Sequence, residues 1–246
     1  ECVSFTRLCY EAALLNHDDE LMERAYRKCV AWDEWLCRNR MTTQSRLVEL
    51  FCLFDTGHDN SDRLAGIKGG CPGGDAKNCN EGDDMPLIAP DLNAVFYSSH
   101  MALADMAAHL GKEQESAAWR EKAREVKQAL IETCYDPEDE FFYDVDRRGR
   151  MRKYKTIHIS NLFCEHLLDQ EMADRIYHRY LHNDKEFWTP YPMASMSISD
   201  PNFKKEREGN DWSYFSQGLT ALRALRWMDD YGYGADLEEL MRIWTD

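Results

Sequence analysis

The sequence contains no long hydrophobic run, and no apolar stretch approaches the roughly 18 residues that a membrane-spanning helix needs. No signal-peptide pattern opens it. Positive charge is also scarce, since 30 Lys and Arg stand against 45 Asp and Glu, for a net charge of -15. Because phosphate backbones and anionic membrane surfaces repel such a chain, we expect no nucleic-acid partner and no membrane partner.

The sequence also lacks a Cys-x-x-Cys pair. Its nine cysteines are an odd number, and most occur within apolar helical patterns, as is typical of small hydrophobic side chains in a reducing compartment. Cys71 and Cys79 flank a Gly-rich loop, where zinc is the alternative, but no His lies at ligand spacing nearby. We therefore expect a cytoplasmic protein without a metal or another cofactor.

The remaining composition suits a folded chain of 246 residues with 43% hydrophobic residues, which is enough for a substantial core. This length fits one domain of moderate size or two small ones. The first residues, Glu1-Cys2-Val3, include no Met. This start indicates a processed, trimmed or partial chain.

Apolar residues recur at helical spacing in pairs of segments, and in each pair a buried type precedes an amphipathic type. Buried helices are predicted over 5–15 and 92–110, which are apolar on most of their circumference. The segments after them, 19–40 and 113–133, each have a single apolar stripe. Two further pairs follow, 157–168 with 171–181 and 214–231 with 235–244.

Connections within the pairs are short, whereas the connections between pairs are long, at 41–90, 135–154 and 183–211. Short turns should therefore gather on one side of the molecule and long loops on the other. We predict an all-α fold, an α/α toroid with the buried helices inside, the amphipathic helices outside and a cleft formed by the long loops. Little β-structure is expected, within 47–54 and in a hairpin that starts near 140–145.

A complete toroid of the (α/α)6 type has six helical hairpins, and the sequence indicates four. Residues 1–246 are therefore predicted to form a single toroid domain within a longer catalytic domain. The alternative is an open arc of helices. A further chain segment or a subunit would complete the ring.

The first long loop contains the stretch 57–63, GHDNSDR, directly after an apolar run. Gly57 permits a sharp turn of the backbone. Asn60, Ser61 and Arg63 then surround the Asp59 carboxyl with amide, hydroxyl and guanidinium groups, which can orient it and tune its pKa for acid chemistry. The structural alternative is an ordinary Asx-rich loop before a helix.

Side chains suited to carbohydrate occur in the same long loops. The faces of Trp188, Tyr191 and Trp212 can stack on the C–H surfaces of a sugar ring, and Asp91 and Asn93 can bind its hydroxyl groups. With Asn60 and Arg63, these are the predicted substrate-binding residues. The alternatives are that the two loop aromatics of 188–191 pack on the rim of the toroid and that Asp91 caps a helix.

The stretch 57–63 resembles the Gly-x-Asp-x-Ser-Pro-Arg signature of (α/α)6 inverting glycosidases, namely trehalases, family 63 α-glucosidases and mannosylglycerate hydrolase-like enzymes. The stretch 90–94, PDLNA, is similar to a second block of that group, and parts of 110–144 and 191–212 resemble later blocks. The resemblance implies a glycoside hydrolase that cleaves an α-linked glucoside or mannoside with inversion. It implies Asp59 as the general acid. The negative charge of the chain favours a neutral sugar.

The sequence departs from that group in two ways. Asp62 replaces the usual Pro and adds a negative charge near Asp59, which would raise the pKa of Asp59 or alter the turn. The group's catalytic base, a Glu in a late loop, falls about where this sequence ends. Glu206 and Glu208 are the local substitutes, in a charged run that otherwise indicates a solvated loop.

Two other functions are compatible with the same fold. A sugar epimerase of the N-acylglucosamine type shares the helical toroid and uses His bases, for which His58, His100, His158 and His166 are available. A lone His on an apolar helix is more often a core residue. The third alternative is a noncatalytic helical subunit.

Overall fold

The computed structural model describes residues 5–58, 60–67, 69–203, 212–213 and 215–245. Helices dominate these residues: α1 (Thr6–Leu15), α2 (Asp19–Asn39), α3 (Pro90–His109), α4 (Glu113–Cys134), α5 (Ile159–Cys164), α6 (Gln170–Ile176), α7 (Gly218–Arg223) and α8 (Gly234–Thr245). Short helical turns are η1 (Asp62–Leu64), η2 (Pro72–Gly74), η3 (Ala76–Asn78), η4 (Tyr177–Leu181) and η5 (Ala224–Arg226). No helix in this described part is both long and apolar enough to cross a bilayer.

The strands are short, as predicted, and antiparallel, but those at 87–88 and 135–136 lie outside the stretches predicted to form β-structure. One sheet has the order β1-β2-β5-β6, with β1 (Glu49–Leu50), β2 (Leu87–Ile88), β5 (Asp144–Val145) and β6 (Met151–Arg152). In it Ile88 pairs with Val145, and Val145 pairs with Met151. A second pair joins β3 (Tyr135–Asp136) to β4 (Phe141–Phe142). The hairpin predicted after 144 is therefore present as β5 and β6.

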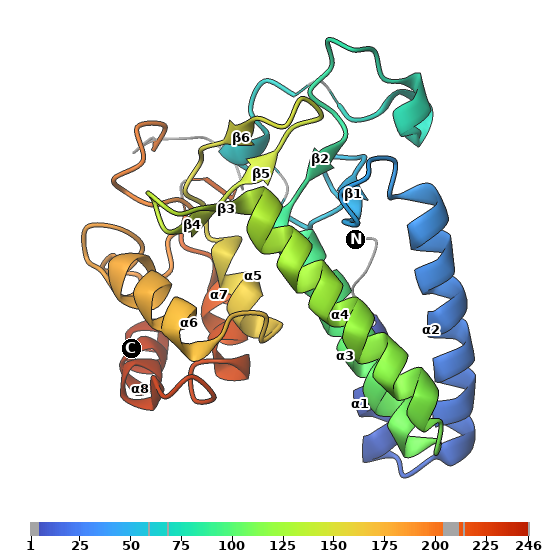
Figure 1. Ribbon diagram of the computed structural model, residues 1–246. Coiled ribbons are helices and arrows are strands. Elements are labelled where there is room, and N and C mark those ends of the chain that lie inside the picture. Colours follow the sequence, from blue (N-terminus) through green and yellow to red (C-terminus); the bar gives the residue numbers. More distant parts are fainter. Residues whose placement is uncertain (1–4, 59, 68, 204–211, 214, 246) are drawn as a thin grey trace.

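The strands and long loops gather at the upper end of the molecule in Figure 1, and the turns between α1 and α2 and between α3 and α4 lie at the lower end. This separation is the one predicted from the alternation of short and long connections. It follows from the antiparallel course of each helical pair. The N-terminus of α3 therefore lies among the loops.

The buried helix α3 lies between its neighbours and contacts α1, α2, α4 and α5. Leu92, Phe96 and Leu103 are buried on one side, and small side chains such as Ala94 and Ala104 are buried on the others. Small residues let the neighbouring backbones approach closely, so a helix without a polar face can be covered all round. This confirms the prediction for 92–110.

The amphipathic helices also form as predicted. In α4 the buried stripe includes Trp119, Ala123, Val126 and Leu130, and polar residues cover the other side. Helix α2 begins after Asp18, whose side chain accepts a hydrogen bond of 2.8 Å from the Leu21 N–H. This contact satisfies a backbone donor that the first helical turn leaves without a partner.

The prediction of a buried helix over 5–15 is wrong. In α1 only Thr6 and Ala13 are buried, whereas Leu8 is 54% and Leu15 is 80% exposed. The helix packs on α2 and α3. Apolar residues around a helix do not bury it unless neighbours cover every side, and such neighbours are not found among the described residues.

The later pairs are shorter than predicted. The sequence pattern predicts one helix over 214–231, but α7 ends at Arg223 and η5 at Arg226. The chain then turns so that Trp227 and Met228 are fully buried, and it turns again at Gly232, whose φ is 83°. Full burial of a large apolar side chain such as Met228 contributes about 1.5–3 kcal/mol, so the turn after η5 gains stability from this packing.

Candidate active site

A buried ion pair joins the first long loop to the start of α3. Arg63, in η1, donates from Nη2 to Asp91 Oδ2 at 2.8 Å and from Nη1 to Asp91 Oδ1 at 3.2 Å. Its Nη1 also lies 3.4 Å from Asp144 Oδ1 in β5. All three side chains are about 1% exposed. One guanidinium therefore fastens the loop to both the helix and the sheet.

The two carboxyl groups around Arg63 differ in their pKa. Burial opposes ionisation of Asp91, but the charge and hydrogen bonds of the Arg63 guanidinium outweigh it, and the pKa of Asp91 is lowered. Burial raises the pKa of Asp144 to about 6, although Arg63 acts in the opposite direction. Asp91 receives two close hydrogen bonds and Asp144 one long contact, which accounts for this difference.

Two buried histidines adjoin this cluster. His58 Nδ1 lies 3.7 Å from Asp91 Oδ2, and its ring centre lies 4.4 Å from that of Trp212. His158 lies with Nε2 3.1 Å from the Phe142 carbonyl and Nδ1 2.5 Å from Thr156 Oγ1. Burial, reinforced by the Arg63 charge, lowers the pKa of each histidine to about 3. Both imidazoles are therefore neutral near pH 7.

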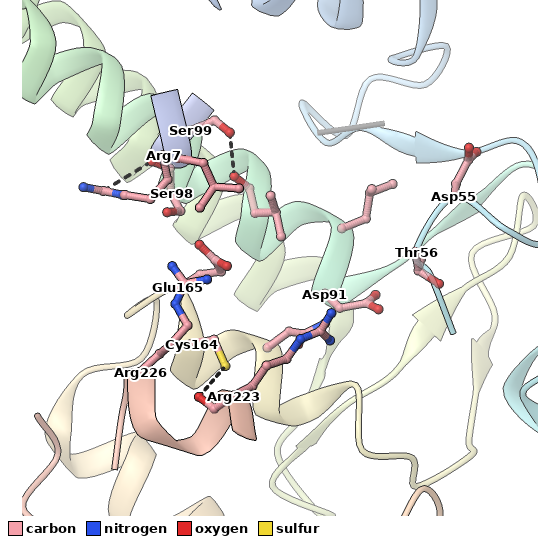
Figure 2. Close-up of a pocket in the computed structure, with 14 residues that line it drawn as sticks. Arg7, Asp55, Thr56, Asp91, Ser98, Ser99, Cys164, Glu165, Arg223 and Arg226 are labelled. Carbon is pink, nitrogen blue, oxygen red and sulfur yellow. Dashed lines mark hydrogen bonds between the residues drawn. The ribbon is translucent and has the colours of Figure 1, made fainter. Parts of the chain in front are cut away.

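A cavity of about 230 Å³ opens beside the cluster. Figure 2 shows Asp55, Thr56 and Asp91 at one side of it, and α1, α3, α5 and α7 provide most of the remaining lining. Asp55 is held by the Arg40 Nη1 at 2.7 Å and by two backbone N–H groups. The volume is slightly below the roughly 300 Å³ at which typical ligand pockets begin.

A family model for the mannosylglycerate hydrolase MGH1-like glycoside hydrolase domain matches residues 4–242. The chain belongs to this glycoside hydrolase family. The resemblance seen in the signature stretch is thereby confirmed. No curated protein matches the chain.

Solved structures of related fold include the GH63 mannosylglycerate hydrolase from Thermus thermophilus in complex with Tris, with a TM-score of 0.76 and 16% identity over 96% of this chain. The same enzyme in complex with glucose has a TM-score of 0.74 and 18% identity, and the match covers 96% of this chain and 63% of that chain. Neutral trehalase Nth1 from Saccharomyces cerevisiae has a TM-score of 0.59 and 19% identity, and the match covers 76% of this chain and 33% of that chain. These likenesses confirm the predicted α/α toroid. The chain spans 65% of the length of the first of them.

In this glycoside hydrolase domain the predicted acid, Asp59, lies outside the described residues, as do Glu206 and Glu208. The residues on either side of Asp59 are described. Gly57 has a φ of 75° and the exposed Asn60 a φ of 58°, so the chain turns sharply here, as the Gly predicted. The catalytic role of Asp59 and the sugar contact of Asn60 stay predictions.

Arg63, Asp91 and Asn93 are brought together near the start of α3, but their polar atoms face protein groups. The Asn93 amide accepts from the Val48 N–H at 2.9 Å and donates to the carbonyls of Val48 and Ala89 at 3.0 Å each. These hydrogen bonds indicate that Asn93 holds the loop in place. They do not favour the predicted contact between Asn93 and a sugar. The capping alternative for Asp91 is wrong, because Ala89 is at the cap position and Asp91 lies within the first turn.

The three aromatic residues predicted to stack on sugar do not lie together in the structure. Trp212 adjoins His58 and thus the signature loop. Trp188 is half-buried, edge-on to His182 at 4.5 Å between ring centres, and Tyr191 is 65% exposed beside Trp244 of α8 at 6.1 Å. The arrangement of these last two agrees with loop packing, and their stacking on sugar stays a prediction.

Sequence reasoning missed Asp144 and gave His158 only an epimerase role. A signal for Asp144 exists, since this acid lies in the otherwise apolar run 141–145, where a charged residue needs a partner. The other epimerase candidates lie apart from the cavity, with His100 paired to Asp33 and His166 to Asp230. Within the described ranges no group of three or more His, Cys, Asp or Glu is arranged to hold a metal.

Proposed function

We propose that the protein is a glycosidase that cleaves an α-linked glucoside or mannoside with inversion. The observation that carries this proposal is the family match over residues 4–242, which includes the signature loop fastened by Arg63. Support for a small sugar substrate comes from solved relatives, one named as a mannosylglycerate hydrolase with bound glucose and one as a trehalase.

Asp59 is proposed as the general acid, which protonates the glycosidic oxygen as the bond to the anomeric carbon breaks. In the sequence, Asp59 is four residues from Asp55 and four from Arg63, and each of these two side chains is held by a partner outside the loop. Anchoring of the segments before and after a catalytic acid is a form of preorganisation, which contributes to catalysis. Inversion also needs a carboxylate base about 6.5–9.5 Å away, which activates water on the opposite face of the sugar.

A neutral His58 is compatible with a general acid in the signature loop. His58 adjoins the acid in sequence and carries no charge near pH 7, so it adds no cation that would hold the Asp59 carboxyl ionised. Trp212 covers the His58 ring and is the aromatic residue that we propose as a sugar platform.

The test is the Asp59→Asn variant of the full-length protein, assayed on α-mannosylglycerate and trehalose. Loss of the acid should lower kcat by roughly 10²–10⁴-fold while the fold persists. Asp184→Asn, an exposed residue in the turn after η4, is the matched control and should be fully active. Full activity of Asp59→Asn on every substrate that the protein cleaves would show that the acid is elsewhere.

The stereochemistry is tested by proton NMR of the first sugar released. A β-anomer formed first from an α-glycoside supports inversion, and an α-anomer contradicts it. The same assay separates hydrolysis from the epimerase alternative, because an epimerase interconverts isomers without releasing a reducing sugar from a glycoside.

We also propose that the residues 1–246 act within a longer cytoplasmic catalytic domain, or with a subunit that completes the ring. The exposed Leu8 and Leu15 of α1 support this, because an inner helix of a closed toroid is covered. The native mass of the active particle tests it. A particle of 28.8 kDa with full activity would contradict this part.

A further inference from the structure

Two of the free cysteines, Cys71 and Cys79, are in contact at the two ends of one short loop. A hydrogen bond joins their thiol groups. Both side chains pack against the same hydrophobic core, where Cys71 is 6% exposed and Cys79 is only partly buried. The loop between them contains η2 and η3 and lies at the upper end of the molecule in Figure 1. The glycosidase mechanism proposed above uses neither sulfur.

The loop 71–79 is closed by its own hydrogen bonds. The Gly74 N–H donates to the Cys71 carbonyl at 2.8 Å. The Asn78 side-chain amide donates to the Pro72 carbonyl at 2.9 Å. Because these contacts hold the two ends of the loop together, the sulfurs are neighbours without a covalent bond between them.

One end of this loop is fixed, and the chain beyond it can adjust. The Cys71 N–H donates to the Phe51 carbonyl at 2.7 Å, and a Cβ added to Gly70 would lie 2.6 Å from that carbonyl oxygen. Gly73 and Gly74 follow, with φ of 66° and 72°, and glycines permit backbone changes that other residues resist. A disulfide needs a sulfur–sulfur distance of about 2.0 Å, shorter than a thiol hydrogen bond, and this loop can supply the movement.

The two thiols differ in reactivity. Burial raises the pKa of the Cys71 thiol to about 12, and the neighbouring Cys79 thiol acts in the same direction. Cys71 is therefore protonated near pH 7 and is a poor nucleophile. Cys79 is the more accessible of the two, so an oxidant in solution meets its sulfur first.

We propose that Cys71 and Cys79 form a site of reversible oxidation, at which a peroxide converts the two thiols to an intramolecular disulfide. The Cys79 sulfur attacks one oxygen of hydrogen peroxide, the O–O bond breaks, and a sulfenic acid and one water form. The Cys71 sulfur then attacks the Cys79 sulfur, the S–O bond breaks, and the hydroxyl leaves with the Cys71 proton as a second water. The thiols lose two electrons to the peroxide, and a thiol reductant reverses the change. This site does not depend on the proposed glycosidase function.

A second pair of thiols is the rival for such a bond. Cys9 of α1 and Cys29 of α2 also share a hydrogen bond, and Cys29 is 1% exposed. Each of these cysteines is held within an α-helix that contains no glycine. The backbone hydrogen bonds of the helices oppose the shift that a disulfide requires, so oxidation favours the glycine-containing loop.

The test uses mass spectrometry, because trypsin cleaves after Lys77 and separates the two cysteines. Cys71 is then in the peptide 69–77 and Cys79 in the peptide 78–112. The full-length protein is reduced, freed of reductant and treated with hydrogen peroxide at pH 7. It is then alkylated in denaturant and digested. The two peptides should be found joined, and dithiothreitol should separate them.

Thermal unfolding gives a second readout. A disulfide that closes the loop 71–79 stabilises mainly by restricting the unfolded chain, and it should raise Tm by several degrees, roughly 4–12 °C, until dithiothreitol is added. Cys79→Ser should show neither the joined peptides nor the rise in Tm. Cys37→Ser, which removes an exposed thiol of α2, is the matched control and should show both.

A Cys79 that stays a thiol, or that oxidises to a sulfinic acid without a link to Cys71, would overturn the proposal. A link from either cysteine to Cys52, or one that forms only in the unfolded protein, would overturn it too. A link between Cys9 and Cys29 alone would assign the oxidation to the contact of α1 and α2 and remove it from this loop. All of these outcomes are read from the wild type, so the test does not require that the Cys79→Ser variant folds.

Discussion

Arg63 and Asp91 form a two-contact ion pair in which both side chains are about 1% exposed, with Nη2 to Oδ2 at 2.8 Å and Nη1 to Oδ1 at 3.2 Å. The pair joins η1 to the first turn of α3, two segments that are 28 residues apart in sequence. It therefore fixes one end of the signature loop against the helix at the centre of the molecule.

Replacing Arg63 by Gln should destabilise the protein strongly. The change leaves Asp91 buried without its cation, and breaking a buried pair in this way costs about 3–5 kcal/mol. Denaturant unfolding at pH 7 measures the loss. Arg124→Gln is the control, because its pair with Glu121 is on the surface of α4 and its removal should change little. Equal losses in the two variants would contradict the structural importance of the buried pair.

Replacing His158 by Gln should make the free energy of unfolding less sensitive to a fall in pH. The pKa of His158 is about 3 in the folded protein against an ordinary 6.5, so the folded state binds fewer protons than the unfolded state between these values. The free energy of unfolding therefore falls as pH drops from about 6.5 toward 3, by up to roughly 1.4 kcal/mol per pH unit for one such group.

Denaturant unfolding of His158→Gln between pH 6.5 and 4.5 should show a shallower fall than the wild type, although its stability at pH 7 is lower because the contacts to Phe142 and Thr156 are lost. His166→Gln, a 49% exposed side chain, should follow the wild type. An identical slope for all three proteins would mean that His158 does not titrate as a buried neutral group.

Replacing Asn93 by Ala should affect stability more than substrate binding. The change removes the side-chain partners of the buried Val48 N–H and C=O, at a cost of roughly 1–3 kcal/mol for each unsatisfied group. The Ala89 carbonyl keeps its bond from the backbone N–H of residue 93. Asn39→Ala, on the exposed end of α2, is the control. A large rise in KM with unchanged stability would instead support the direct sugar contact predicted from sequence.

Replacing Trp212 by Ala should raise KM, whereas replacing Tyr191 should not. Trp212 adjoins His58 in the signature loop, and loss of an aromatic contact costs about 0.5–1.5 kcal/mol beyond the area buried, or roughly two- to tenfold in KM. Tyr191 packs beside Trp244, apart from that loop. Steady-state kinetics on α-mannosylglycerate compare the two variants. A larger effect of Tyr191→Ala would place the sugar at the α8 side.

The sequence alone determined the long helices α2, α3 and α4, the alternation of short and long connections and the family signature, whereas the later pairs are shorter than their patterns predict. These features are local or periodic. Single apolar stripes specify helices such as α4, and Gly57 specifies a turn whose φ of 75° few other residues adopt. The toroid follows from them because the pattern repeats along the chain.

Only the tertiary structure decided which polar residues meet. Asp91 and Asp144 come from segments far apart in the sequence, and each needs Arg63 because a buried charge must be paired. No spacing reveals such a partnership, so the sequence predicts a sugar ligand or a cap at Asp91. Burial and pairing depend on what packs around a side chain, and packing is a property of the folded chain.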